Sequence, residues 1–401
     1  MRSSWPPHYY RPDPLELVSG HITGVLDRPD PVYAAGRDLP HGMSPRAVLE
    51  EVVLAALTRP PCVVEFSGGR DSSVLLAVGA HVARREGLPM PVPITFRYQN
   101  EPHTDESSWQ EMVIAHVGIA DWERVDVGNR HDMVGDLATQ FLRGHGVVYP
   151  PTLYNKTLPF TLGRGGSHMS GEGGDEVFGF RRGAVLRKLR SEPRLLLHRR
   201  NIRDLGLYLG PVQVRAVLLR KSISAVIEDC LTYLRPGVEC QVLDNLVKEH
   251  AAEPFDVTSS LGWHLRRKVV ANLQEAITAF AAESDVFHLD PFLEPRFVAS
   301  YARVVKPLGL CSRTQAMRSL FADLLPDALL TRTSKAIFNR GYLTDVGRAF
   351  AANWHGGGVD TRLVDTEKLR SRWLSEWPPH QSFLLLQAAW LHENQPQPDL
   401  Q

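Results

Sequence analysis

The sequence has few of the features that mark metal-binding or redox proteins. It contains four cysteines, which are widely separated, and no two of them form a C-x-x-C pair. The spacing excludes the usual sequence patterns of a structural zinc site and of a redox dithiol. None of the 16 histidines belongs to an H-E-x-x-H motif. Cysteines that are few and widely separated predict a reducing, cytoplasmic location.

An excess of charge of one sign and long apolar runs are also missing. Lys plus Arg and Asp plus Glu both number 45, so the formal net charge is zero. This balance argues against a nucleic-acid partner, which would favour a basic surface. No apolar run reaches the length of a membrane span, and no apolar stretch follows the first residues. We therefore expect neither a membrane segment nor a signal peptide.

What is present is enough chain for a large folded protein. The 401 residues, 43% of them hydrophobic, suffice for about two domains. Residues 1–50 are rich in Pro, Gly and charge and are predicted to form an N-terminal extension. We predict an α/β domain over residues 51–186 and a mostly helical domain over residues 187–401.

The apolar pattern of the first half alternates between short buried runs and helical spacing, which predicts a parallel sheet covered by helices. The expected strands are 62–66, 94–98, 125–127 and 167–170, and the expected helices are 45–58, 72–86, 105–117 and 131–143. Thr104 is the predicted N-cap of the third of these helices, and Gly87 the predicted C-cap of the second. From about residue 187 onward strand signals are few, and helical spacing dominates.

The first expected strand is followed by segment 67–73, Ser-Gly-Gly-Arg-Asp-Ser-Ser, which opens a helix. Two adjacent glycines let the backbone approach an anion, and the free N–H groups of the helix start point at that anion. The hydroxyls of Ser67, Ser72 and Ser73 add donors, and Asp71 suits a magnesium ion held on phosphates. A plain capped connection between strand and helix would not need so many polar groups in this register.

This segment has neither the Walker A nor the Rossmann glycine spacing. It resembles the PP-loop, S-G-G-x-D-S-S, of the ATP pyrophosphatases. The resemblance implies that ATP is cleaved between its α and β phosphates and that the departing pyrophosphate is held in this loop.

A second loop, segment 170–176, places three glycines among three carboxylates in Ser-Gly-Glu-Gly-Gly-Asp-Glu. Acidic groups beside a nucleotide need a metal ion to bridge them to phosphate. Extended by Val177-Phe178-Gly179, the segment resembles the S-G-E-G-x-D-E-x-x-G signature of asparagine synthetases. The two motifs in this order make the resemblance specific.

Two later segments match the same family. Segment 290–297 resembles its P-F-L-D segment, with Glu294 in place of Asp. Segment 313–338 contains an L-R-x-x-F, L-P and R-x-x-K run. The resemblance covers roughly residues 50 to 345. It implies a PP-loop sheet domain of the adenine nucleotide alpha hydrolase type, followed by a mostly helical domain that completes the active site.

The resemblance also implies ATP and Mg²⁺ as cofactors and a role for each matching residue. Lys335 would face the α-phosphate and stabilise the transition states. Glu172 would lie near the acceptor amine, where it takes a proton or helps to bind magnesium. Asp71 and Asp175 are the predicted metal ligands, and Phe96 is expected to meet the adenine. The predicted ATP and pyrophosphate ligands are Ser67, Gly68, Gly69, Asp71, Ser72, Ser73, Phe96, Ser170, Gly171 and Gly173.

Ordinary structural roles compete with some of these assignments. Most lysines are solvated surface residues, so the role assigned to Lys335 depends on the match of the residues that flank it. Glu65 is unusual in a buried strand and is either part of the site or paired with a neighbour. Asp105 and Glu106 either contribute to the site or stabilise the first turn of a helix.

The sequence departs from complete asparagine synthetases in two ways. They begin with Cys directly after Met and release ammonia from glutamine, whereas Arg2 follows Met1 here. About 50 residues precede the synthetase-like core, too few for a glutaminase fold. The family's D-R pair is replaced by Thr278 and Ala279. These departures fit relatives that use a substrate amine, such as β-lactam synthetases and lasso-peptide cyclases.

We therefore expect adenylation of a substrate carboxylate and attack by a substrate amine, in the biosynthesis of a specialised metabolite or a modified peptide. The expected partner is a small molecule or peptide with both groups. Biosynthetic partner proteins and further copies of the chain are the protein partners to consider. One alternative is amidation with ammonia from a separate glutaminase. A second is a non-catalytic nucleotide-binding subunit. A third, a sulfur-transfer enzyme acting on RNA, is disfavoured by the neutral charge and the unpaired cysteines.

Overall fold

The computed structural model describes residues 9–98, 101–191, 199–305, 308–310, 312–334, 336 and 339–394. Lys335, the predicted catalytic lysine, lies outside the described residues.

A five-stranded sheet with the strand order β3-β2-β1-β4-β5 forms the centre of the fold, and all its neighbouring strands are parallel. In the central strand, Val63 pairs with Val92 on one side and with His168 on the other. The strands are β1 (Cys62–Glu65), β2 (Val92–Arg97), β3 (Glu123–Asp126), β4 (Ser167–Met169) and β5 (Phe287–Leu289).

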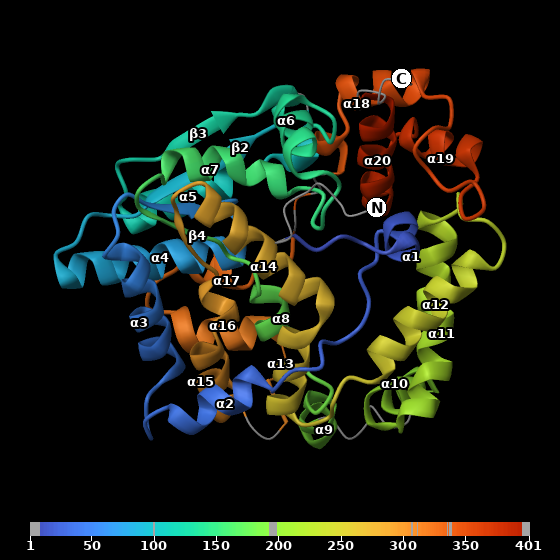
Figure 1. Ribbon diagram of the computed structural model, residues 1–401. Helices are drawn as coiled ribbons and strands as arrows, with labels where there is room; N and C mark the ends of the chain where they lie inside the picture. Colours follow the sequence, from blue (N-terminus) through green and yellow to red (C-terminus); the bar gives the residue numbers. More distant parts are fainter. Residues whose placement is uncertain are drawn as a thin grey trace.

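Helices cover both faces of this sheet, as the arrangement in Figure 1 shows. One face is covered by α3 (Pro45–Leu57) and α4 (Arg70–Glu86), with α5 (Ser107–Val117) packed on α4. The other face is covered by α7 (Thr157–Leu162) and α14 (Lys268–Glu283). A parallel sheet buried on both faces accounts for the continuous apolar run of β1, because both sets of its side chains meet helices.

The remaining elements are helical among the described residues. The α-helices are α1 (Pro14–Ser19), α2 (Pro31–Asp38), α6 (Asp136–His145), α8 (Gly174–Phe178), α9 (Ala184–Ser191), α10 (Arg199–Leu209), α11 (Val212–Cys230), α12 (Val238–Ala251), α13 (Val257–Arg266), α15 (Pro295–Val305), α16 (Arg313–Phe321), α17 (Asp327–Leu330), α18 (Asp345–Asn353), α19 (Thr366–Trp373) and α20 (Phe383–Asn394). The 3₁₀ helices are η1 (Pro102–Thr104), η2 (Gly128–His131), η3 (Leu153–Lys156), η5 (Pro291–Leu293), η6 (Asn339–Tyr342) and η7 (His380–Ser382). Helices α11 and α12 lie side by side at the right of Figure 1.

The buried side chains form two apolar clusters. The first lies between the sheet, α3, α4, α13 and α15, and includes Val32 and Leu39 from the N-terminal segment. The second joins α6 and η3 to α12, α19 and α20, and includes Tyr9 and Val18. The N-terminal segment therefore contributes to both cores, because its few apolar side chains insert between helices from later parts of the chain.

The α/β fold class predicted from the sequence is confirmed by the parallel sheet and its helical cover. The four expected strands and the four expected helices of the first half are present, with shifted ends. The predicted cap at Thr104 is wrong. Helix α5 begins at Ser107 after Glu106, and the Thr104 hydroxyl instead donates a hydrogen bond to the Glu101 carbonyl. Strand β5 was not predicted. The proposed division into three segments stays a prediction.

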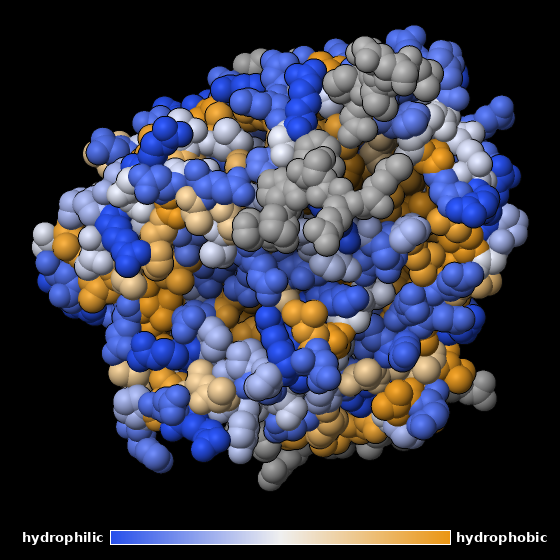
Figure 2. Space-filling view, viewed as in Figure 1, coloured by the Kyte–Doolittle hydropathy of each residue, from blue (hydrophilic) through white to orange (hydrophobic). Residues whose placement is uncertain are grey.

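On the face seen in Figure 2, apolar side chains are scattered among hydrophilic ones. Within the described residues, no helix combines the length and the apolar character that crossing a membrane requires.

Candidate active site

The candidate site lies where the strand order of the sheet reverses. Strands β1 and β4 are neighbours in the sheet although two strands separate them in the sequence. The connections that leave their carboxyl ends open a crevice there, which is the usual ligand site of such sheets. The two Gly-rich loops, 67–73 and 170–176, follow these two strands. A cavity of about 430 Å³ lies between them.

The first loop is shaped to expose backbone N–H groups. Gly68 has φ +83°, and a Cβ there would lie 2.8 Å from the Gln110 side chain. Both the backbone angle and the lack of space therefore require glycine. Gly69 occupies the N-cap position of α4 without a side-chain hydrogen bond. The helix start is therefore available to an anion. The loop is braced from inside, because the Ser67 and Ser72 hydroxyls lie 3.1 Å apart and Gln110 Nε2 donates to the Ser67 carbonyl at 3.0 Å.

The second loop packs directly on the first, and this contact explains its glycines. A Cβ on Gly174 would lie 2.2 Å from Asp71 Cγ, and one on Gly171 would lie 3.0 Å from the Ser72 backbone nitrogen. Gly173 has φ +88°, and a Cβ there would meet the Leu293 side chain. The two motifs recognised separately in the sequence thus form one structure.

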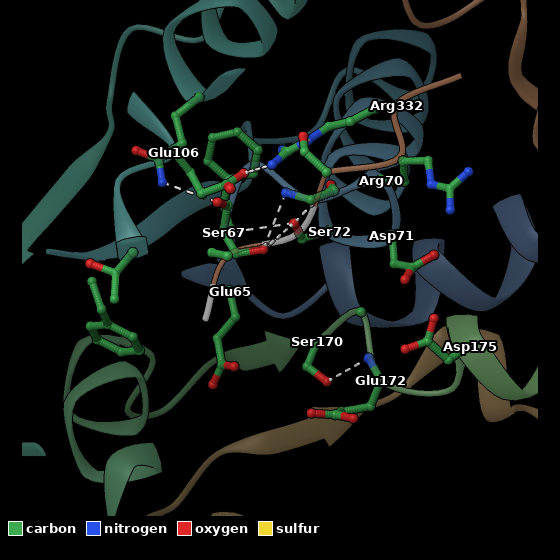
Figure 3. A pocket seen from close by; sticks show the side chains of 18 of the residues that line it. Glu65, Ser67, Arg70, Asp71, Ser72, Glu106, Ser170, Glu172, Asp175 and Arg332 are labelled. Carbon is green, nitrogen blue, oxygen red and sulfur yellow. Dashed lines mark hydrogen bonds and ion pairs between the residues drawn. The ribbon is translucent and has the colours of Figure 1, made fainter. Parts of the chain in front are cut away.

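Two carboxylates meet at one end of the cavity. Asp71 and Asp175 face each other at the right of Figure 3, and the Arg313 guanidinium forms an ion pair with each of them. Burial raises the pKa of Asp71, against the opposing effect of Arg313.

The same pair of carboxylates suits a magnesium ion. Asp71 Oδ1 is buried and finds no hydrogen-bond partner among the described residues. No cluster of three or more His, Cys, Asp or Glu side chains suited to a metal was found in the part of the chain that the structure describes. Magnesium commonly binds through one or two carboxylates plus substrate phosphates. Asp71 and Asp175 therefore fit as its protein ligands, in the place that Arg313 bridges.

Further cations line the wall beside the first loop. Arg332 donates to the Gly68 carbonyl at 3.0 Å and forms an ion pair with Glu106. Its guanidinium also lies 4.8 Å from the centre of the Trp109 ring. Arg70, Arg313 and Arg332 all line the cavity, which suits an anionic polyphosphate. Glu106, for which two roles were open, lines the cavity and holds Arg332.

The opposite wall of the cavity is more apolar. It includes Ile94 and Phe96 from β2, together with Tyr98 and Tyr342. The Phe96 ring meets the His131 ring edge-on, with centroids 4.6 Å apart. A flat apolar wall at the end of β2 is compatible with the predicted adenine contact of Phe96, which stays a prediction.

A partly buried ion pair lies beside the cavity. Lys156 Nζ donates to both Glu65 carboxylate oxygens at 2.7 Å, and His168 Nε2 lies 3.1 Å from Glu65 Oε1. Burial alone would raise the pKa of Glu65, but Lys156 and His168 outweigh it and hold that pKa well below its usual range. Burial lowers the pKa of His168 to about 4. Glu65 was expected either to pair with a neighbour or to belong to the site. The structure shows that it pairs with Lys156 and also lines the cavity.

From His168 a chain of contacts leads back to the second loop. Its Nδ1 lies 2.9 Å from His288 Nδ1, and His288 Nε2 lies 3.1 Å from an Asp290 oxygen. Asp290 accepts a hydrogen bond from Ser170 Oγ at 2.6 Å, and that hydroxyl accepts one from the Glu172 backbone N–H at 3.2 Å. His288 and Asp290 belong to or directly follow β5, so this strand links the ion pair to the second loop.

Glu172 lines the cavity, and its side chain is exposed. Desolvation raises the pKa of Glu172 to about 7, with Lys156 opposing the shift and Asp290 and Glu65 adding to it. A carboxylate with a pKa near neutrality is suited to accept a proton from an amine. Figure 3 shows the Glu65 and Glu172 carboxylates in its lower part, away from Asp71 and Asp175.

Most of the predicted site residues meet in this cavity. Those that line it are Ser67, Gly69, Asp71, Ser72, Phe96, Ser170, Gly171, Glu172 and Asp175. Gly68, Ser73 and Gly173 do not line it. Gly68 and Gly173 shape the two loops, and the Ser73 hydroxyl is fully buried beneath the first loop.

Some lining residues carried no interpretable signal in the sequence. Arg313 and Tyr342 come from distant helical segments, and only the tertiary structure brings them to the cavity. Lys156 belongs to η3, in a stretch for which no element was predicted.

Comparison with known proteins agrees with this geometry. A family model described as asparagine synthase matches residues 45–377. The matched region contains both Gly-rich loops, the sheet and every residue that lines the cavity. No curated protein matches the chain.

Proposed function

The chain belongs to the asparagine synthase family, whose members catalyse ATP-dependent amide formation, and on this basis we propose that it joins a substrate carboxylate to a substrate amine. The carboxylate would first be adenylated, and AMP and pyrophosphate would be released. Such a reaction suits the biosynthesis of a specialised metabolite or a modified peptide.

The observation that carries this proposal is the division of the cavity into two chemically different ends. One end has the exposed start of α4, the arginines and the Asp71–Asp175 pair, which suit polyphosphate and its metal. The other end has Glu172, which suits an amine. The α-phosphate and the acyl carbon would lie between the two ends.

The proposed reaction has two steps. In the first, an oxygen of the substrate carboxylate bonds to the α-phosphorus, and the bond to the β-phosphate oxygen breaks, so that pyrophosphate leaves. The backbone N–H groups at the start of α4, with Ser67 and Ser72, hold this leaving group. Asp71 and Asp175 would hold a magnesium ion, which would supply positive charge to the phosphates.

In the second step the amine nitrogen bonds to the acyl carbon. The bond between that carbon and the oxygen of AMP breaks, and its electron pair leaves with AMP. Glu172 is placed to take one proton from the incoming ammonium, and the second proton passes from nitrogen to solvent. Lys335, through its match to the family, is proposed to stabilise the charge that develops in both steps.

Exchange of labelled pyrophosphate into ATP tests the first step directly. The purified chain should catalyse this exchange with at least one member of a panel of carboxylic acids and peptides, and only with magnesium present. Turnover should then give AMP and pyrophosphate. Direct formation of ADP and phosphate would contradict the proposal, and nucleotide binding without any exchange would favour a non-catalytic subunit.

A further inference from the structure

A second, smaller cavity opens beside the first, on the side of Glu172. Its volume is about 170 Å³, and we refer to it as the inner chamber. It shares Glu65, Phe96, Tyr98, Glu172 and Tyr342 with the larger cavity, so the two spaces have a common wall. A molecule in the inner chamber would therefore lie next to the groups that face the reacting end of the nucleotide site.

The charges of the inner chamber favour a cation. Lys156 lines it but already donates two hydrogen bonds to Glu65, so these two charges cancel. Glu172 adds one negative charge when it is ionised. Glu65 and Glu172 thus offer carboxylate oxygens opposed by a single cation, and a cleft with this negative balance attracts an ammonium group.

Two further side chains in the inner chamber have unsatisfied polar atoms. His131 Nε2 and Asn155 Oδ1 find no hydrogen-bond partner among the described residues, although His131 is fully buried and Asn155 is 8% exposed. The other ring nitrogen of His131 is used, because Nδ1 lies 2.9 Å from the Tyr98 hydroxyl. Unpaired buried polar atoms destabilise a fold, so a polar group that reached these two atoms would be stabilised by pairing with them.

The size and walls of the inner chamber indicate more than ammonia. A water-sized molecule occupies only roughly 30 Å³. Leu153, Leu273 and Ile277 add apolar surface to the wall. The best match is a molecule with an ammonium group, a short apolar body and one further polar group.

We propose that the inner chamber binds the acceptor, and that the acceptor is a compact organic amine with a second hydrogen-bonding group rather than free ammonia. This inference rests on the proposed function and specifies its acceptor. The ammonium lies at Glu172, on the side of the inner chamber next to the larger cavity, and gives Glu172 one proton, so that its nitrogen lone pair becomes free to attack the acyl carbon. Asn155 and His131 hold the second polar group.

Asn155→Leu is the sharpest test, because it removes the unpartnered Oδ1 and replaces the amide with an apolar side chain of similar size. Asn272→Leu is its matched control. Asn272 is also buried with an unpartnered side-chain atom, but it does not line the inner chamber. The probes are ammonium chloride and small primary amines with one polar group, such as ethanolamine, 3-aminopropanol and glycinamide. Their binding to the full chain is measured by calorimetry, with and without Mg-ATP.

We expect at least one organic amine to bind more tightly than ammonium. Asn155→Leu should weaken the binding of that amine about tenfold, as expected for one lost hydrogen bond, without lowering the thermal stability of the protein. Asn272→Leu should leave amine binding unchanged. The proposal is overturned if no amine in the panel binds better than ammonium, or if Asn155→Leu binds the best amine as wild type does.

Pyrophosphate exchange, measured on the same samples, separates this inference from the proposed function. Exchange without preferential amine binding would defeat the inference and leave the adenylation intact. Amine binding that depends on Asn155, without exchange for any acid, would defeat the proposed reaction and leave an amine site.

Discussion

Glu172 lies in the wall common to the cavity and the inner chamber, and its ionisation should be visible in the pH dependence of catalysis. Its pKa is raised to about 7, and the ionised form is the proton acceptor. The rate of amide formation should therefore rise with pH up to about 7 and then level off. Glu172→Gln should be slow at every pH, while Glu111→Gln, an exposed change on α5, should keep the wild-type profile.

The same shift has a consequence for stability. An acid whose pKa is raised on folding favours the folded state while it is protonated, and this contribution is lost as pH rises from 4.5, its ordinary value, through about 7. The unfolding temperature of Glu172→Gln should thus be higher than that of the wild type above pH 7, and the two should differ least below pH 4.5. An unchanged difference across this range would show that Glu172 is not desolvated in the folded protein.

Lys335 is the other residue on which the chemistry depends, and its role rests on the R-x-x-K run that begins at Arg332. Lys335→Ala should leave ATP binding largely intact and slow turnover by about a hundredfold or more, since one preorganised charge is lost. Lys335→Arg should not restore the rate, because a planar guanidinium cannot replace a compact ammonium. Lys221→Ala, at an exposed position on α11, is the control. Near-normal turnover of Lys335→Ala would remove this lysine from the mechanism.

At the scale of elements, the two Gly-rich loops act as one unit because they touch. Gly174→Ala should push Asp71 out of place, since the added Cβ would lie 2.2 Å from Asp71 Cγ. Such overpacking costs about 1–3 kcal/mol, so affinity for Mg-ATP should fall about tenfold. Gly144→Ala in α6 meets nothing within 4 Å and should be neutral or slightly stabilising. Mg-ATP titration of both variants checks this, and equal affinities would show that the loops move independently.

At the scale of the whole molecule, the N-terminal segment contributes buried side chains to both cores. Helix α2 packs on α13 and α15, and Val32 within it is fully buried. Val32→Ala should lower the free energy of unfolding by about 2 kcal/mol, because it removes most of a buried side chain. Its neighbour Tyr33 is 66% exposed, so Tyr33→Ala should change the free energy of unfolding by less than about 0.5 kcal/mol. Denaturant unfolding measures both, and equal effects would mean that α2 is not docked.

The sequence by itself determined the fold class and most of the nucleotide end of the site. Each Gly-rich loop is a contiguous run after a strand, so its chemistry could be predicted from neighbouring residues alone. Segments 67–73 and 170–176 follow strands that are neighbours in a parallel sheet, and parallel strands place their carboxyl ends at the same edge. Their meeting at that edge depends on the adjacency of β1 and β4, which only the tertiary structure shows.

Only the tertiary structure decided which groups surround Glu172. Glu65, Lys156 and His168 come from three separate segments, and although Glu65 is unusual in a buried strand, nothing in its own segment names its partners. Strand β5 has three residues between long helices, too few to show a period, yet it supplies the link from His288 to Asp290. These groups meet because two apolar cores fold segments from distant parts of the chain against one sheet. Contacts of that kind depend on packing between elements, which no local pattern in the sequence records.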